Sequence, residues 1–166
     1  MKLKYFPVLF ALLLIGCSKK NEKFYYDLGA DNNKKENYQE AVKNYDLQVK
    51  NFPESRYTPT ALYNLGIIFN NQKIKLLSEQ QSYDKAMGYF KQLYENYPKS
   101  KEAPQALFMM GFMYENQMQK QDDARTIYKK FLNEYPNNEL APMVKAELDN
   151  LGLSPEEIIK RNPKNK

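Results

Sequence analysis

The chain has 166 residues, of which 42% are hydrophobic and 27% are charged, a composition that fits one modest globular domain with a hydrophobic core. It has one cysteine and no histidine, which excludes an intrachain disulfide and any catalytic site that uses histidine as its base. The formal net charge is +5, and the lysines are scattered among glutamate and asparagine, a pattern that does not favour nucleic acid as a partner.

Residues 1–16 are predicted to be a cleaved signal peptide. Lys2 and Lys4 precede an apolar run of about a dozen residues, which is short of the ~20 residues that a membrane-spanning helix needs. The segment from Leu14 to Cys17 resembles the bacterial lipobox, and this resemblance implies cleavage before Cys17 and a covalent lipid on that cysteine. The alternatives are that Cys17 is a buried thiol or that cleavage follows another small residue.

Residues 17–21 would then be the lipidated cysteine and a short polar tether. Lys19 follows Cys17 by two residues, and nothing near it resembles the acidic tags that keep some lipoproteins at the inner membrane or send others to the cell surface. The lipobox resemblance therefore implies an anchor in the outer membrane, with the protein facing the periplasm.

The rest of the chain repeats itself. The stretch NFPESRYTPTALYNLG (residues 51–66) returns 45 residues later as NYPKSKEAPQALFMMG (96–111), and a fainter copy begins at Glu134. Apolar residues around each glycine recur at i, i+3, i+4 and i+7, which predicts α-helices, and prolines mark where one helix ends and the next begins. We expect a domain over residues 22–153, with repeats at about 22–55, 59–100 and 104–138, a capping helix at 142–151, and a short helix and frayed basic tail over 154–166.

Glycine occupies the same helical position in each repeat. A mid-helix glycine costs about 1 kcal/mol relative to alanine, so Gly29, Gly66 and Gly111 need a compensating contact. We expect this contact to be the close approach of the second helix, with a small residue facing each glycine. The candidate small residues are Ala41, Ala86 and Ala124.

The second repeat is longer than the other two. Gly66 and Ala86 are twenty residues apart, whereas Gly29 and Ala41 are twelve apart. Eight extra residues are close to two helical turns, and Ile74 and Leu77 continue the apolar pattern. We therefore predict that both helices of this repeat are longer by one turn; the alternative is a flexible loop at residues 78–82.

Over residues 21–152 the chain contains helix pairs that carry L-G and an aromatic residue on the first helix, followed by Ala, an aromatic residue and Pro on the second. These helix pairs resemble tetratricopeptide repeats (TPR). The YP that ends a second helix, with Ser and AP-x-A-L after it, resembles more specifically a bacterial envelope subset that contains the BamD outer-membrane assembly lipoproteins and the YbgF/CpoB proteins associated with Tol-Pal. The resemblance implies an all-α solenoid of about three helical hairpins plus a C-terminal capping helix. BamD-like proteins carry more repeats, and YbgF-like proteins have a preceding coiled coil and no lipid.

A second row of residues lies beside the apolar row on the first helix of each repeat. In TPR proteins this row lines the concave groove that holds partner peptides, and aromatic rings with amides suit an extended peptide. The alternative is that the rings only pack between helices. The candidate groove residues are Tyr26, Asn33, Tyr63, Ile67, Asn70, Phe108, Phe112 and Asn116.

The resemblance implies a non-enzymatic, outer-membrane-anchored scaffold that binds envelope proteins or peptides, in β-barrel assembly or in Tol-Pal and cell-envelope coordination. We expect no cofactor other than the lipid on Cys17, no metal, no nucleic acid and no small-molecule substrate. Asp122 and Asp123 fit a helix N-terminus better than an acid–base pair. The alternatives are a structural self-associating module and a binder of glycan strands.

Overall fold

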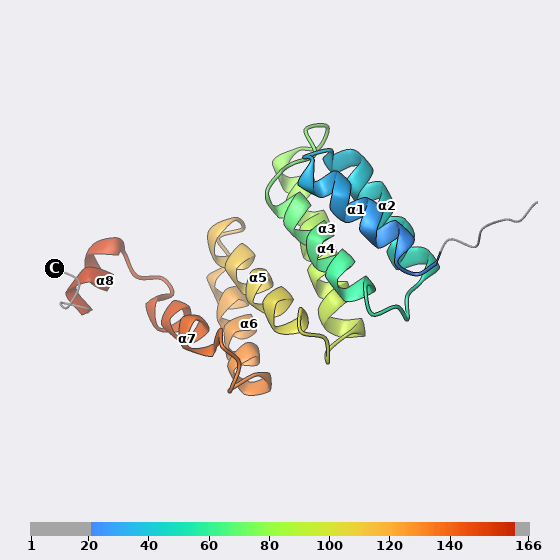
Figure 1. The fold of residues 1–166 in the computed structure, drawn as a ribbon. Helices are drawn as coiled ribbons and strands as arrows, with labels where there is room; N and C mark the ends of the chain where they lie inside the picture. Colours follow the sequence, from blue (N-terminus) through green and yellow to red (C-terminus); the bar gives the residue numbers. More distant parts are fainter. Residues whose placement is uncertain (1–20, 162–166) are drawn as a thin grey trace, which may run out of the picture.

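The computed structural model describes residues 21–161, and the secondary structure in this range is helical, with no strand (Figure 1). The predicted signal peptide, Cys17 and the last five residues therefore lie outside the described residues. The helices are α1 (Phe24–Lys34), α2 (Tyr38–Asn51), α3 (Thr58–Asn70), α4 (Glu79–Asn96), α5 (Ala103–Asn116), α6 (Gln121–Glu134), α7 (Ala141–Asn150) and α8 (Pro155–Arg161). The predicted all-α class is confirmed. No helix in this range has both the length and the apolar character needed to span a membrane.

The helices form a row of hairpins, in which α1 pairs with α2, α3 with α4 and α5 with α6 (Figure 1). Adjacent hairpins are joined by packing of α2 on α3 and of α4 on α5, and α7 packs on α6 at the end of the row. Each helix thus mainly contacts its neighbours in the chain, which is the arrangement of a helical solenoid.

Prolines and tyrosines define the joints between hairpins. Pro59, Pro104 and Pro142 lie in the first turns of α3, α5 and α7, where the missing N–H leaves no helical hydrogen bond unmade. The tyrosine at the end of each later second helix bonds to the preceding joint. The Tyr97 hydroxyl donates to the carbonyl oxygen of Pro53 (2.8 Å), and the Tyr135 hydroxyl donates to that of Pro98 (3.3 Å). The repeated YP motif therefore ties each joint to the one before it.

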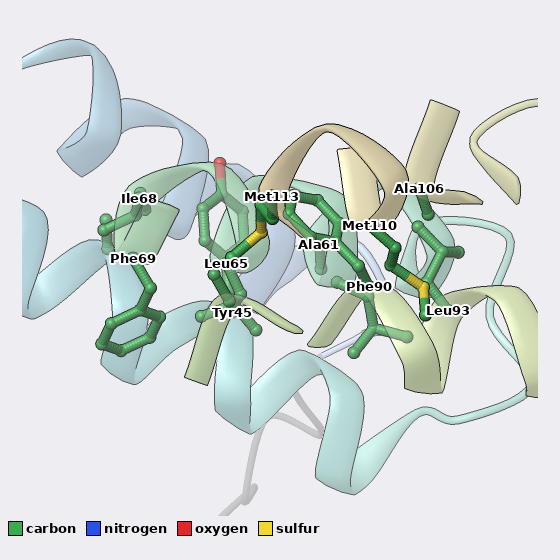
Figure 2. Packing of buried hydrophobic residues seen from close by; sticks show 13 residues of the cluster. Tyr45, Ala61, Leu65, Ile68, Phe69, Phe90, Leu93, Ala106, Met110 and Met113 are labelled. Atoms are coloured by element: carbon green, nitrogen blue, oxygen red, sulfur yellow. The ribbon is translucent and has the colours of Figure 1, made fainter. Parts of the chain in front are cut away.

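The hydrophobic core runs along the row between first and second helices. Figure 2 shows part of it, with Tyr45 from α2, Leu65 from α3, Phe90 from α4 and Met110 from α5 in one cluster. A second cluster continues through α5, α6 and α7. The side chains of Tyr45, Leu65 and Phe90 are at most 1% exposed, so burial of these residues is the main stabilising contribution to the stack.

In each repeat the side chain that lies against the glycine of the first helix is an aromatic ring of the second helix and not an alanine. The atoms nearest to a Cβ built on Gly66 belong to the ring of Phe90, with Cδ1 and Cζ each at 2.7 Å. The same relation joins Gly29 to Tyr45 and Gly111 to the ring of a tyrosine on α6. The prediction that the small residue faces the glycine is therefore wrong. Ala41, Ala86 and Ala124 are fully buried, one helical turn before these rings.

The connection between α3 and α4 also differs from the prediction. Helix α3 ends at Asn70, so the predicted extension of the first helix is wrong. Helix α4 has 18 residues against 14 in α2 and in α6, so the predicted extra turn of the second helix is confirmed. Residues 71–78 form a loop, from which Ile74 and Leu77 pack against the core. Their apolar pattern thus reflects loop packing and not a helical face. The alternative of a loop at 78–82 was also misplaced, because Ser78 caps α4 and accepts from the Gln81 backbone N–H (3.2 Å).

Helix α7 ends the row with charged residues where earlier first helices are apolar. Its Ala-Pro start aligns with the Ala103-Pro104 start of α5, which places Lys145 at the position of Leu107 and Asp149 at that of Gly111. The Nζ atom of Lys145 lies 2.9 Å from Oδ2 of Asp149, and both side chains are more than half exposed. This face of α7 therefore lacks the leucine and the glycine that receive a second helix in α3 and α5.

Candidate partner-binding face

The solvent-facing residues of α1, α3 and α5 form what we call the first-helix face. The predicted groove residues all lie on these helices, and they sit between core and solvent. Leu62, Leu65 and Leu107 on the same helices are fully buried. By contrast, Asn116 is exposed, and the other predicted groove residues are half-buried: Tyr26, Asn33, Tyr63, Ile67, Asn70, Phe108 and Phe112.

The aromatic rings of this face are supported from behind. The ring centroid of Tyr63 lies 5.9 Å from that of Phe90, the ring that packs on Gly66. Tyr26 contacts Tyr45 in the same way at 6.2 Å, and Phe108 contacts the equivalent tyrosine of α6 at 6.4 Å. Groove lining and helix packing were treated as alternatives from the sequence. In the structure each ring packs on an aromatic ring of the second helix while part of it remains exposed.

The asparagines of the face are less available than the sequence suggested. The Asn116 side-chain amide donates to the carbonyl oxygen of Phe112, one turn earlier in α5 (3.1 Å). The Oδ1 atom of Asn70 is buried and has no hydrogen-bond partner. A further asparagine that the sequence did not single out, Asn64, donates to the Tyr45 hydroxyl (3.1 Å) and thereby joins α3 to α2. The amides of Asn64 and Asn116 therefore hold the helices together and are not free to bind a partner backbone.

A pocket of about 480 Å³ opens at the start of this face, and sequence reasoning missed it. Glu102, the residue before α5, is only 5% exposed there. The Thr60 hydroxyl donates to Glu102 Oε1 (2.6 Å), across 42 residues of sequence. Nothing in the sequence around Glu102 distinguishes it from an ordinary surface carboxylate, because its burial depends on the stacking of α3 beside α5.

Two stacked tyrosines line the same pocket. The rings of Tyr26 and Tyr57 lie 5.1 Å apart at an interplanar angle of 25°. The guanidinium of Arg56 lies over the Tyr57 ring at 4.8 Å, and its Nη2 donates to the Tyr57 hydroxyl (2.6 Å). Burial raises the pKa of Tyr26, and the charges of Asp27 and Glu102 raise it further.

The other end of the face also carries carboxylates. Glu115 on α5 accepts from the hydroxyl of Tyr128 (2.7 Å). Burial raises the pKa of Glu147 on α7, and the nearby charge of Glu115 raises it further. Helices α3 and α5 contain one charged residue between them, which is Glu115. On α3 and α5 the first-helix face is thus apolar and aromatic, with one negative charge and no basic residue, whereas α1 carries acidic residues and Lys34.

Comparison with protein families matches the tetratricopeptide repeat model to residues 60–100 and 105–138. These two segments are tetratricopeptide repeats. The two matched segments contain α3 with α4 and α5 with α6, and the first hairpin has the same glycine–ring contact, so that the predicted TPR solenoid is confirmed as the fold. A search of curated proteins gives no match. TPR solenoids present an extended surface that typically binds protein partners, which makes the first-helix face the candidate site.

Proposed function

We propose that this TPR protein is a non-enzymatic scaffold that binds envelope proteins or peptides on its first-helix face. The observation that carries the proposal is the repeated, supported aromatic row. Tyr26, Tyr63 and Phe108 are half-buried, and each rests on a ring of its second helix. Because packing already restricts these rings, a partner that contacts them loses little side-chain freedom on binding. Aromatic residues of this kind commonly dominate interface energetics.

We further propose that a lipid on Cys17 anchors the scaffold to the outer membrane, facing the periplasm. The support comes from the lipobox-like sequence at residues 14–17. Only Ser18, Lys19 and Lys20 separate Cys17 from Asn21, the first described residue, and this stretch spans no more than about 15 Å. The repeats would then lie close to the bilayer surface, within reach of membrane-embedded partners.

The role of such a scaffold would be β-barrel assembly or coordination of the Tol-Pal and peptidoglycan machinery, as the resemblance to the BamD and YbgF/CpoB families suggests. The identity of the proteins that this scaffold holds in one complex would distinguish these two roles. Recovery of β-barrel assembly factors supports the first, and recovery of Tol-Pal components supports the second.

The experiment is crosslinked capture from envelopes with variants of the aromatic row. We expect Tyr63→Ala and Phe108→Ala to lower partner recovery several-fold while both proteins remain folded. Tyr83 is a matched control, because it is also half-buried but lies on α4. Tyr83→Ala should leave recovery unchanged. If all three variants recover every partner as well as the parent protein does, the first-helix face is not the binding surface.

Two other functions have separate tests. A self-associating module would elute as a dimer or larger species at micromolar concentration, and Tyr63→Ala would shift it to the monomer. A glycan binder would sediment with purified peptidoglycan in the absence of any protein. The scaffold proposal predicts neither result.

A further inference from the structure

The first-helix face has a charge pattern that selects among partner proteins. The inference rests on the proposed function and adds the chemistry of the bound segment. Helices α3 and α5 carry no lysine or arginine, and the carboxylates of Glu102 and Glu115 lie at the two ends of α5. The second helices differ, because α2, α4 and α6 each carry basic as well as acidic residues.

The pocket at Glu102 contains a buried negative charge with little internal compensation. Glu102 is 5% exposed, and its Oε1 accepts from the Thr60 hydroxyl. Lys101 lies 3.7 Å from the same oxygen, but its own side chain is 85% exposed, so this ion pair contributes little. A buried carboxylate is stabilised when a cation is brought to it, because the charge was already removed from water by folding. The Ser100 hydroxyl, also in this pocket, is buried without a hydrogen-bond partner.

The aromatic wall of the pocket already holds a cation. Arg56 places its guanidinium 4.8 Å from the centre of the Tyr57 ring, although Arg56 is itself exposed. The electron-rich ring faces that tyrosine presents attract cations in this geometry. Tyr26 stacks on Tyr57 in the same wall. A buried carboxylate and tyrosine rings that line one pocket are the groups that recognise lysine and arginine side chains.

We propose that the first-helix face binds a positively charged, partly apolar segment of a protein partner, with one lysine or arginine side chain in the Glu102 pocket. Apolar side chains of the segment lie along Tyr63, Ile67 and Phe108. A second basic side chain is placed near Glu115 and Glu147 at the far end. An acidic segment is disfavoured, because it would bring like charge to a buried carboxylate.

The test uses the full-length protein in detergent and three synthetic peptides of equal length. One peptide alternates Lys and Leu, one alternates Glu and Leu, and one alternates Ser and Leu; each carries a fluorophore for anisotropy. We expect the Lys peptide to bind at least tenfold more tightly than the Glu peptide, and its affinity to fall as salt is raised. Equal affinity for the Lys and Glu peptides would overturn the proposal.

Two variants identify which carboxylate is responsible for the preference for the Lys peptide. Glu102→Gln keeps an oxygen for the Thr60 hydroxyl but removes the charge, and we expect it to weaken Lys-peptide binding about tenfold or more. Glu95→Gln changes the net charge equally, but on α4, and should leave the affinity unchanged. If both variants weaken Lys-peptide binding equally, only the net charge of the protein matters, and the proposal that a basic side chain binds in the Glu102 pocket is overturned.

A third variant makes the test independent of how well Glu102→Gln folds. Arg56→Ala removes the cation that covers the Tyr57 ring, so the Lys peptide should bind about two- to threefold more tightly. Weaker binding of the Lys peptide to this variant would contradict the proposal. If the Ser peptide binds best and Tyr63→Ala weakens it, the binding face stands and the preference for a cation is wrong. If no peptide binds and Tyr63→Ala leaves partner capture unchanged, the proposed function itself fails.

Discussion

Gly66 on α3 lies directly against the ring of Phe90 on α4, with no room for a Cβ between them: one built there would be 2.7 Å from Cδ1. Real Cβ atoms do not approach carbon this closely, so the helices would have to move apart. The same contact recurs in the other two hairpins. It sets the spacing of first and second helices throughout the solenoid.

Gly66→Ala should therefore destabilise the protein by about 1–3 kcal/mol, because the added methyl overpacks a fully buried ring. Gly88 is a matched control, since it lies inside α4 with nothing within 4 Å of its Cβ position. Gly88→Ala should stabilise by up to about 1 kcal/mol through helix propensity. Urea unfolding of both variants measures the difference. A Gly66→Ala protein as stable as Gly88→Ala would refute this account of the helix spacing.

Tyr63 and Leu65 provide a second comparison on one helix. Leu65 is fully buried, and Leu65→Ala should cost ~2–5 kcal/mol because it leaves a cavity in the core. Tyr63 is half-buried, so Tyr63→Ala should cost clearly less. Thermal melting of the two variants tests this. Equal losses would show that the Tyr63 ring belongs to the core and not to a binding surface.

Glu36 allows a stabilising substitution. It ends the turn after α1 with φ of 60°, in the left-handed region that favours glycine. Glu36→Gly should raise the unfolding free energy by about 0.5–1 kcal/mol, as relief of backbone strain exceeds the added entropy of the unfolded chain. The measurement is the midpoint of urea unfolding. Lys50→Gly in the last turn of α2 is the contrasting change and should destabilise.

Asp46 makes stability depend on pH in a defined direction. Burial raises its pKa above the ordinary 3.8, although the hydroxyl of Tyr89 donates to it (2.9 Å). The folded state then binds the proton more tightly than the unfolded state, so the contribution of Asp46 is most favourable below pH 3.8. It is lost as the pH rises from there through the raised pKa. Asp46→Asn retains an acceptor for Tyr89 and should remove this dependence. Unfolding measured across this pH range checks it, and an unchanged profile would exclude Asp46 as its source.

Cys17→Ala tests the proposed anchor. Without the thiol no lipid can be attached, so we expect the precursor to stay unlipidated and the protein to lose stable membrane association. Acyl labelling and membrane fractionation measure the two effects. Ser18→Ala, which keeps the cysteine, should be labelled and fractionate like the parent chain. Membrane association that survives Cys17→Ala would rule out lipidation as its cause.

The sequence was sufficient for the helices and their stacking, because the period of 3.6 around Gly66 and Gly111 and the prolines at the joints are local signals. Partners across the stack were not predictable in the same way. Each buried aromatic follows its alanine by one turn, and the sequence alone does not show that the ring, and not the methyl, meets the glycine. Ile74 and Leu77 are spaced three residues apart and therefore match a helical period, although both lie in a loop and pack against the core from there.

The aromatic residues of the candidate site could be predicted from the sequence, but its buried carboxylate could not. Tyr63 and Phe108 are found by their offset from the buried leucines, which is fixed by helix geometry. Glu102 becomes a buried carboxylate only because Thr60, 42 residues earlier, is brought beside it. Such a contact depends on the angle between neighbouring hairpins, which no single repeat specifies.

The Lys145–Asp149 pair on α7 limits how this gene can change in length. An additional hairpin placed after α7 would meet the charged side chains of Lys145 and Asp149 where a leucine and a glycine are required. Duplication of an internal segment such as 60–100 carries its own leucine, glycine and joint with it. Longer relatives of this chain would therefore arise by insertion within the row, with α7 and its charged pair kept after the last hairpin.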